Sequence, residues 1–298
     1  MTDGPLISIV LPTFNGARYL RGAVESVRLQ TWTHWELILV DDCSTDATPA
    51  LIAELAAAEP RIRAFRNPVN RRLPRSLNAG FERARGEFLT WTSDDNEYRP
   101  GALERLHRVL ESDPGAGVAY SDAFEIDDDG RPLGPWRAPE PEALGWCNSV
   151  NACFLYRRAV AEQVGGYDDH WVLVEDWDFW MRVSLKFRLR VLHEDLYLYR
   201  RHARSLTTTR AAEIRRARLA LMEQRVPEMH WLDRRSRAEA WLKMARQAHE
   251  LQEPDRERRF NRRALAASPL FALAKITGRA VLGHDRAGAL RHRLRGRR

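Results

Sequence analysis

Short apolar runs alternate with helix-like stretches through the first half of the chain, and this alternation constrains the fold more than any other feature. The runs at 6–11 (LISIVL) and 35–40 (WELILV) are too short for buried helices and fit buried strands. Further strands are expected at 61–66 and 87–92, and helices at 17–29, 45–58 (capped by Thr45 or Asp46) and 73–85. This order of βαβ units predicts an α/β fold with a mostly parallel sheet flanked by helices.

Polar residues follow the carboxyl ends of three of these strands. The clusters are Thr13–Asn15 after the first strand, Asp41-Asp42 after the second and Asp94-Asp95 after the fourth. The carboxyl ends of parallel strands lie along one edge of a sheet, where ligands bind in open α/β folds. The three clusters therefore predict one binding crevice.

The character of the sequence changes near residue 211. Before that point, the pattern predicts a helix at 100–110, a strand at 117–121, a hairpin turn at 127–130, a loop at 134–144, a helix at 172–186 and a strand at 191–199. Beyond it, helices are expected at 211–225, 236–251 and 255–267, the last two forming one degenerate pair of the tetratricopeptide type. We therefore expect a sheet-containing domain over 1–210 and a basic helical appendage over 211–298.

Charge is distributed unevenly along the 298 residues. Residues 211–298 carry 22 Lys and Arg against 10 Asp and Glu, a net charge of +12, whereas residues 1–210 carry 26 against 31, a net charge of −5. Such a basic tail is typical of contact with nucleic acid or an anionic membrane, or of a solvated helical surface. The tail lacks aromatic stacking motifs, which argues against specific nucleic-acid binding.

Cysteine usage and hydropathy indicate the compartment. The three cysteines cannot all pair within the chain and lack zinc-ligand spacing, which fits a reducing environment. The first residues lack the basic flank and cleavage site of a signal peptide. No uncharged apolar run is long enough to cross a bilayer. We expect a cytoplasmic protein, with peripheral contact at the inner face of the membrane through the basic tail.

The paired acids at the strand ends point to chemistry. Asp94 and Asp95 can bind Mg²⁺ or Mn²⁺, which prefer hard oxygen ligands and are often completed by substrate phosphates. An Asp-rich turn is the alternative for these two residues. Asp41 and Asp42 can accept hydrogen bonds from a ribose or a base, beside a helix N-terminus that favours phosphate. The chain has neither a G-x-G-x-x-G nor a phosphate-loop motif, so those two nucleotide-binding folds are not supported.

Four segments occur in a fixed order and spacing: SIVLPTFNGARYL, ELILVDDCSTDAT, RSLNAGFERARGEFLTWTSDDNEYRPGAL and EDWDFWMRV. Together they resemble the family 2 glycosyltransferases, which have the GT-A fold and use nucleotide-diphosphate sugars. The resemblance covers about Leu6 to Ser205. It implies an inverting transfer of a sugar to an acceptor hydroxyl, assisted by Mn²⁺ or Mg²⁺.

The resemblance also implies roles in nucleotide binding. Pro12, Thr13 and Phe14 would line the nucleobase, partly through backbone atoms. Asp42 would contact the base, with Asp41 beside it.

Basic residues are implied near the nucleotide phosphates and the metal. The candidate near the nucleotide is Arg72, with Arg71 or Arg75 as alternatives in a variable segment. His202 would approach the diphosphate or the metal, and Arg200 and Arg201 are equal candidates for neutralising phosphate.

The resemblance further implies where metal and base lie. Asp94 would reach the ribose or the metal, and Asp95 would be the principal metal ligand, although Asp94-Asp95-Asn96 departs from the commoner Asp-x-Asp pattern. Asp176 occupies the position of the catalytic base. On a helix, Glu175 and Asp178 share a face while Asp176 points elsewhere. The interleaved aromatic residues of this segment, Trp177, Phe179 and Trp180, indicate partial burial.

The leading hypothesis is thus an inverting glycosyltransferase in the synthesis of a cell-surface glycan or another glycoconjugate. Its partners would be a nucleotide-sugar donor and a hydroxyl acceptor, either a glycan, a lipid-linked molecule or a small molecule. The alternative is a catalytically degenerate homologue that binds nucleotide and is tethered by its basic tail to a membrane or an acidic partner. Acceptor selectivity is expected in residues 122–150 and after residue 188.

Overall fold

The computed structural model describes residues 4–150 and 152–282. Contacts divide the chain into two compact units, Met1–Leu221 and Met222–Arg298. The first unit holds a nine-stranded sheet with the helices around it, and the second is helical. The division falls within α8 (Ala211–Arg225), whereas the composition changes near its first residue.

The N-terminal half of the sheet is parallel, as its element order predicts. β1 (Ile7–Thr13) lies between β2 (Trp35–Asp41) and β4 (Phe88–Trp91), and β3 (Ile62–Arg66) pairs with the other side of β2. Every residue of β1, β2 and β4 is buried. Burial of both faces explains why these strands read as continuous apolar runs rather than alternating ones.

The other half of the sheet is mixed. β8 (Phe154–Arg157) runs antiparallel to both β4 and β6 (Ala116–Ile126), and β9 (Arg188–Arg200) pairs with β6 in parallel. β5 (Glu97–Tyr98) pairs antiparallel with β9, and β7 (Pro132–Trp136) forms the expected hairpin with β6. The sequence pattern does not predict β5 or β8, because segments of two and four residues are too short to show a period.

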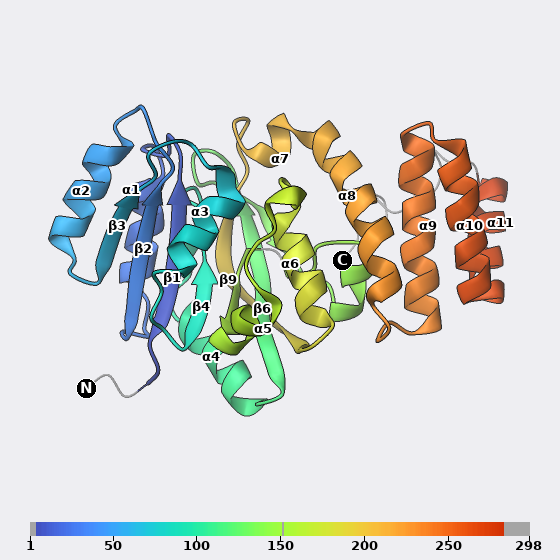
Figure 1. Ribbon diagram of the computed structural model, residues 1–298, viewed down its shortest axis with the longest axis horizontal. Helices are drawn as coiled ribbons and strands as arrows, with labels where there is room; N and C mark the ends of the chain where they lie inside the picture. Colours follow the sequence, from blue (N-terminus) through green and yellow to red (C-terminus); the bar gives the residue numbers. More distant parts are fainter. Residues whose placement is uncertain (1–3, 151, 283–298) are drawn as a thin grey trace. The chain divides into compact units, whose positions relative to one another are not determined.

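Helices accompany the sheet throughout the first unit (Figure 1). They are α1 (Leu20–Arg28), α2 (Thr48–Ala58), α3 (Arg72–Phe81), α4 (Ala102–Ser112), α5 (Arg158–Val164), α6 (Glu175–Ser184) and the short α7 (Leu206–Thr209). α1 shows why the pattern predicts them: its apolar side chains Leu20, Val24 and Val27 recur at helical spacing and are all buried in the main core.

Two segments differ from expectation. α2 begins at Thr48 rather than at residue 45, and its N-cap residue is Ala47 rather than Thr45 or Asp46. The Asp46 carboxylate accepts a hydrogen bond from the N–H of Thr48, the first residue of the helix (2.9 Å). The segment 134–144 is not wholly a loop, since it contains the end of β7 and most of a 3₁₀ turn over Pro141–Gly145.

The second unit contains three helices that lie side by side in Figure 1: α9 (Arg234–Glu250), α10 (Pro254–Ala267) and α11 (Pro269–Leu282). The rings of Trp241 in α9 and Phe260 in α10 stack with their centroids 6.0 Å apart. α10 and α11 each begin at a proline. Proline is tolerated at this position because an N–H there would have no hydrogen-bond partner within the helix. Within residues 4–150 and 152–282, no helix combines the length and the apolar character needed to cross a bilayer.

Candidate active site

A pocket of about 710 Å³ lies at the carboxyl ends of β1, β2 and β4. This volume is within the usual range for small-molecule sites. The predicted residues that line it are Pro12, Thr13, Phe14, Asp42, Arg72, Asp94, Asp95, Asp176 and His202. The three strand-end clusters therefore do reach one crevice, and α6 and the segment after β9 add to it.

Asp42 lines the pocket in a fixed orientation. Its carboxylate accepts hydrogen bonds from Asn67 Nδ2 (2.8 Å) and from the backbone N–H groups of Arg71 (2.8 Å) and Arg72 (2.9 Å). Hydrogen bonds to an ionised acceptor are the stronger kind. The side chain is thus held in place before any ligand arrives.

Asp41 does not line the pocket, contrary to its expected place beside the nucleotide. It is buried, accepts a hydrogen bond from the Ser44 N–H (2.9 Å) and pairs with the Arg66 guanidinium (3.0 Å). Asp41 is the last residue of β2, where successive side chains alternate between the two faces of the sheet, and Asp42 begins the loop after it. Asp41 supports the loop after β2 instead.

The three candidate arginines near the nucleotide are distinguished by the structure. Arg72 lines the pocket at a backbone φ of +66°, an unfavourable region for a side-chain-bearing residue. Arg75 instead pairs with Asp169, its Nε lying 2.6 Å from the carboxylate, and Arg71 contributes its backbone to Asp42. Neither Arg71 nor Arg75 lines the pocket.

The Asp94 carboxylate lies against the loop that follows β1. The Thr13 hydroxyl donates a hydrogen bond to its carboxylate, and burial, aided by the neighbouring Asp95, raises the pKa of Asp94 to about 7. A Cβ atom at Gly16 would come within 1.9 Å of Asp94 Oδ2 and 2.3 Å of Thr13 Oγ1. Glycine is therefore required at position 16, a functional constraint that the sequence signals only as an Asn-Gly turn.

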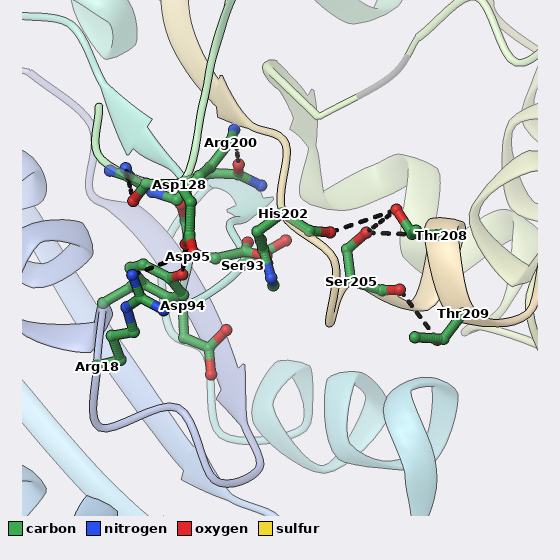
Figure 2. Close-up of polar contacts among 12 residues, drawn as sticks. Arg18, Ser93, Asp94, Asp95, Asp128, Arg200, His202, Ser205, Thr208 and Thr209 are labelled. Atoms are coloured by element: carbon green, nitrogen blue, oxygen red, sulfur yellow. Dashed lines mark hydrogen bonds and ion pairs between the residues drawn. The ribbon is translucent and has the colours of Figure 1, made fainter. Parts of the chain in front are cut away.

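Asp95 and His202 meet from the ends of β4 and β9, as Figure 2 shows. Asp95 Oδ2 lies 2.9 Å from His202 Nε2. Asp95 Oδ1 and His202 Nδ1 are buried, and neither has a hydrogen-bond partner in the described part of the chain. The pair thus presents polar atoms whose desolvation is not offset by the protein.

Arg200 and Arg201 do not line the pocket, so the structure does not support them as phosphate partners. Arg200 is buried, pairs with Glu97 (2.8 Å) and donates its Nε–H to the Asp95 carbonyl (3.0 Å). Arg201 pairs with Glu125. Arg200 therefore fastens β9 to the loop carrying Asp95.

The side chains around Asp95 offer few ligands for a divalent cation. In residues 4–150 and 152–282, no group of three or more His, Cys, Asp and Glu side chains is placed to hold a metal ion. Mg²⁺ commonly takes one or two carboxylates, the rest of its shell coming from water and substrate phosphates. Asp95, with an orphaned buried oxygen beside an imidazole, fits such a partial site, and imidazole favours Mn²⁺ over Mg²⁺.

Two adjacent carboxyl groups at the start of α6 also line the pocket. Asp176 accepts hydrogen bonds from the Trp177 N–H (2.7 Å) and from Asn148 Nδ2 (2.6 Å), yet burial raises its pKa. Burial and the Asp176 charge raise the pKa of Glu175 to about 8, and Glu175 Oε2 has no partner among the described residues.

Asp178 behaves differently from Glu175, although the two were expected to share a helix face. It is fully buried and accepts a hydrogen bond from Arg182 Nε (2.7 Å) one turn later. The aromatic residues interleaved with these acids, Trp177, Phe179 and Trp180, are buried as predicted.

Several lining residues lie outside the sequence prediction. Arg18 and Tyr19 enter from the loop before α1, and Arg204 and Arg210 from the segment after β9. Asp128, at the hairpin tip, pairs with Arg18 (3.1 Å) and accepts a hydrogen bond from the Tyr19 hydroxyl. The only sequence signal for Arg204 and Arg210 is their closeness to His202.

The family model for "Glycosyl transferase family 2" matches residues 8–165. EpsE of Bacillus subtilis (strain 168), provisionally named a glycosyltransferase, is 30% identical over 213 residues, which cover 67% of this chain and 74% of EpsE. The O-antigen biosynthesis protein RfbC of Myxococcus xanthus is 30% identical over 184 residues, covering 60% of this chain. The match spans 14% of RfbC and 22% of another relative, so some relatives are much longer proteins.

Solved structures share the fold. S. aureus TarS (residues 1–349, with UDP-GlcNAc) has a TM-score of 0.62 at 14% identity, over 85% of this chain and 90% of that one. The mannosyltransferase PcManGT of Pyrobaculum calidifontis, with GDP-Man and Mn²⁺, has a TM-score of 0.54 at 18% identity, over 98% and 80% of the two chains. At such identities these structures establish the GT-A architecture alone, and the family match completes the assignment: this chain belongs to glycosyl transferase family 2.

Proposed function

We propose that this glycosyltransferase moves a sugar from a nucleotide-diphosphate sugar to an acceptor hydroxyl with inversion at the anomeric carbon. The observation that carries the proposal is that one pocket of about 710 Å³ gathers Asp42, Asp95 and Asp176 from three separate parts of the chain. Structures with the same fold contain UDP-GlcNAc or GDP-Man, which supports a nucleotide-sugar donor.

The nucleoside would lie at the Asp42 end. Pro12, Thr13 and Phe14 would line the base, and the fixed Asp42 carboxylate would accept hydrogen bonds from a base or ribose edge. Among the described residues no carboxylate forms an ion pair with Arg72, and its guanidinium would face the phosphates.

Asp95, with Asp94 and His202 beside it, would hold Mn²⁺ or Mg²⁺. Bound there, the cation would stabilise the negative charge of the departing diphosphate as a Lewis acid. The Mn²⁺ complex of PcManGT supports this proposal. Arg204 and Arg210 line the same pocket and would add positive charge around the phosphates.

Asp176 would act as the general base. Its carboxylate would take the proton of the acceptor hydroxyl as that oxygen bonds to the anomeric carbon and the bond to the diphosphate oxygen breaks. Its pKa, raised by burial, lies closer to neutral pH than that of an exposed aspartate, which suits a base. A single displacement of this kind inverts the anomeric centre.

The names of the relatives support one class of acceptor. RfbC is named for O-antigen biosynthesis, which supports an acceptor in the synthesis of a cell-surface glycan. We place the enzyme in the cytoplasm, with its basic C-terminal region in peripheral contact with the membrane.

Titration calorimetry with UDP and GDP, each with and without Mn²⁺, tests the site. We expect the parent protein to bind one nucleoside diphosphate more tightly with Mn²⁺, and Asp95→Ala to lose that gain while keeping the metal-free affinity. Equal affinities for parent and variant would count against Asp95 as a metal ligand. Binding without any turnover of a nucleotide-sugar panel would instead favour the degenerate homologue.

A further inference from the structure

The helix α11 exposes an apolar face. Leu270 is 86% exposed and Leu273 is 52% exposed, and Ala274 and Thr277 are exposed as well. Positions 270, 273, 274 and 277 fall on one side of a helix. These four residues are called the α11 face below. Leaving two leucines in water on one helix side is unfavourable unless something covers them.

The opposite side of α11 is anchored within its own unit. Ala272 is fully buried, and the helix contacts both α9 and α10. The Phe271 ring lies 5.0 Å from the Arg235 guanidinium and 5.6 Å from the Lys275 ammonium. The leucines of the α11 face are therefore not the side by which the helix packs onto its neighbours.

The sequence that holds this face is also the most basic part of the chain. Residues 269–298 carry 8 Lys and Arg against 1 Asp, a net charge of +7, which equals the net charge of all 298 residues. Residues 1–268 carry 40 basic and 40 acidic side chains and are neutral. One of the cations, Lys275, is exposed on α11 itself.

We propose that the α11 face binds the surface of an anionic lipid bilayer. Leu270 and Leu273 would enter the boundary between headgroups and acyl chains, while the basic residues of 269–298 would be attracted by lipid phosphates and carboxylates. Exposed apolar residues on one helix side, within a strongly basic sequence, are typical of a helix that lies in the membrane interface. The proposal deepens the membrane association included in the proposed function and does not depend on the chemistry of the pocket.

Two other occupants fit the observations less well. A nucleic acid would neutralise the cations but would leave both leucines in water. A second copy of the chain would cover the leucines but would bring two segments of charge +7 together, which is repulsive at low ionic strength. An anionic bilayer satisfies both features at once.

Co-sedimentation of the full chain with vesicles tests the proposal. We expect binding to phosphatidylcholine vesicles containing about one-third phosphatidylglycerol, weak binding to phosphatidylcholine alone, and a loss of binding at high salt. The double variant Leu270→Glu/Leu273→Glu should lower partitioning at least about tenfold. Leu29→Glu, at a leucine 62% exposed elsewhere in the chain, is the matched control and should bind as the parent does.

The charge contribution has its own variant pair. Arg291→Glu/Arg293→Glu should lower partitioning by roughly fivefold for each arginine lost. Arg215→Glu/Arg216→Glu changes the same charge at exposed positions of α8 and should have a smaller effect. Circular dichroism of every variant separates lost binding from lost folding, and donor turnover without vesicles reports the pocket separately.

Three outcomes would overturn the proposal. Failure of the parent protein to sediment with anionic vesicles would contradict the proposed binding directly. Equal sedimentation of parent and Leu270→Glu/Leu273→Glu, with loss in the arginine variants, would indicate a general polyanion site. A change of molecular mass in gel filtration for the leucine variant, with vesicle binding intact, would indicate a contact between copies of the chain.

Discussion

The carboxyl groups that line the pocket are held in two different ways. Asp42 accepts three hydrogen bonds from protein N–H groups. Asp95 and Glu175, in contrast, each keep a buried oxygen that no group in the described ranges satisfies, and burial raises the pKa of Glu175 to about 8. Asp42 with its hydrogen-bond partners, called the Asp42 end below, is thus complete without ligand, which suits binding. Asp95 and Glu175, with Asp176 next to Glu175, are called the chemistry end below; this set is electrostatically incomplete, which suits chemistry on a charged substrate.

Replacing the proposed base, Asp176, should give the largest difference between the effect on kcat and the effect on nucleotide affinity. Asp176→Asn keeps the size of the side chain but cannot accept the proton, so we expect kcat to fall by about 10²–10⁴-fold. Nucleotide affinity, set by the Asp42 end, should stay within about twofold. Steady-state kinetics and calorimetry measure the two quantities. Asp169→Asn, at the surface and paired with Arg75, is the control; a similar fall in that variant would remove Asp176 from its role.

Removing Asp42 should produce the converse effect. Asp42→Ala leaves three N–H groups without their acceptor, so we expect nucleotide affinity to fall by about tenfold or more, and the free energy of unfolding to fall by roughly 2 kcal/mol. kcat at saturating donor should change little. Calorimetry and urea unfolding check this result, and a fall in kcat as large as that of Asp176→Asn would contradict the division of roles.

Asn148 lies in the segment 122–150, where acceptor selectivity is expected, and its loss should have a moderate effect. Its Nδ2 donates to the Asp176 carboxylate (2.6 Å), which favours the ionised form of the base. In Asn148→Ala the pKa of Asp176 should rise, moving the acidic limb of kcat/KM to higher pH by up to about one unit. A pH–rate profile that only drops, with no shift along the pH axis, would assign Asn148 a purely structural role.

Glu175→Gln should give the smallest effect. Glu175 has a folded pKa near 8, above its ordinary value of 4.5, so the stability that goes with its neutral form is present below about pH 4.5 and is lost as pH rises towards 8. Glutamine stays neutral, so the variant should lose less stability than the parent between mildly acidic and mildly basic pH. Thermal unfolding at several pH values measures the difference, and parallel curves would contradict it.

The sequence predicts the part of the pocket at the strand ends better than the part that α6 and the segment after β9 contribute. Thr13, Asp42 and Asp94 follow parallel strands, and parallel topology alone brings strand ends to one edge. The prediction errs at Asp41, because the alternation of a strand separates neighbouring side chains. Asp41 and Asp42 look equivalent in the sequence, but Asp41 ends β2 while Asp42 begins the loop that lines the pocket.

The chemistry end depends on contacts that no local pattern encodes. Asn148 reaches Asp176 from a segment 28 positions away, and the antiparallel insertion of β8 that organises this half is too short to show a period. The resemblance to a known family supplied Asp176 and His202, but their neighbours Arg204 and Arg210 come to the pocket only through the path of the chain after β9.

The meeting of Asp95 and His202 has a consequence for how the chain acquires its native state. The two residues are 107 positions apart, and they come together only when β9 has joined β5 and β6. Closing a loop of that length carries a large entropic cost before any contact rewards it. The parallel strands β1 to β4 are synthesised well before β9 leaves the ribosome. A nascent chain can therefore form the part of the pocket at β1 to β4 early. The part that includes His202 can form only after β9 has been translated.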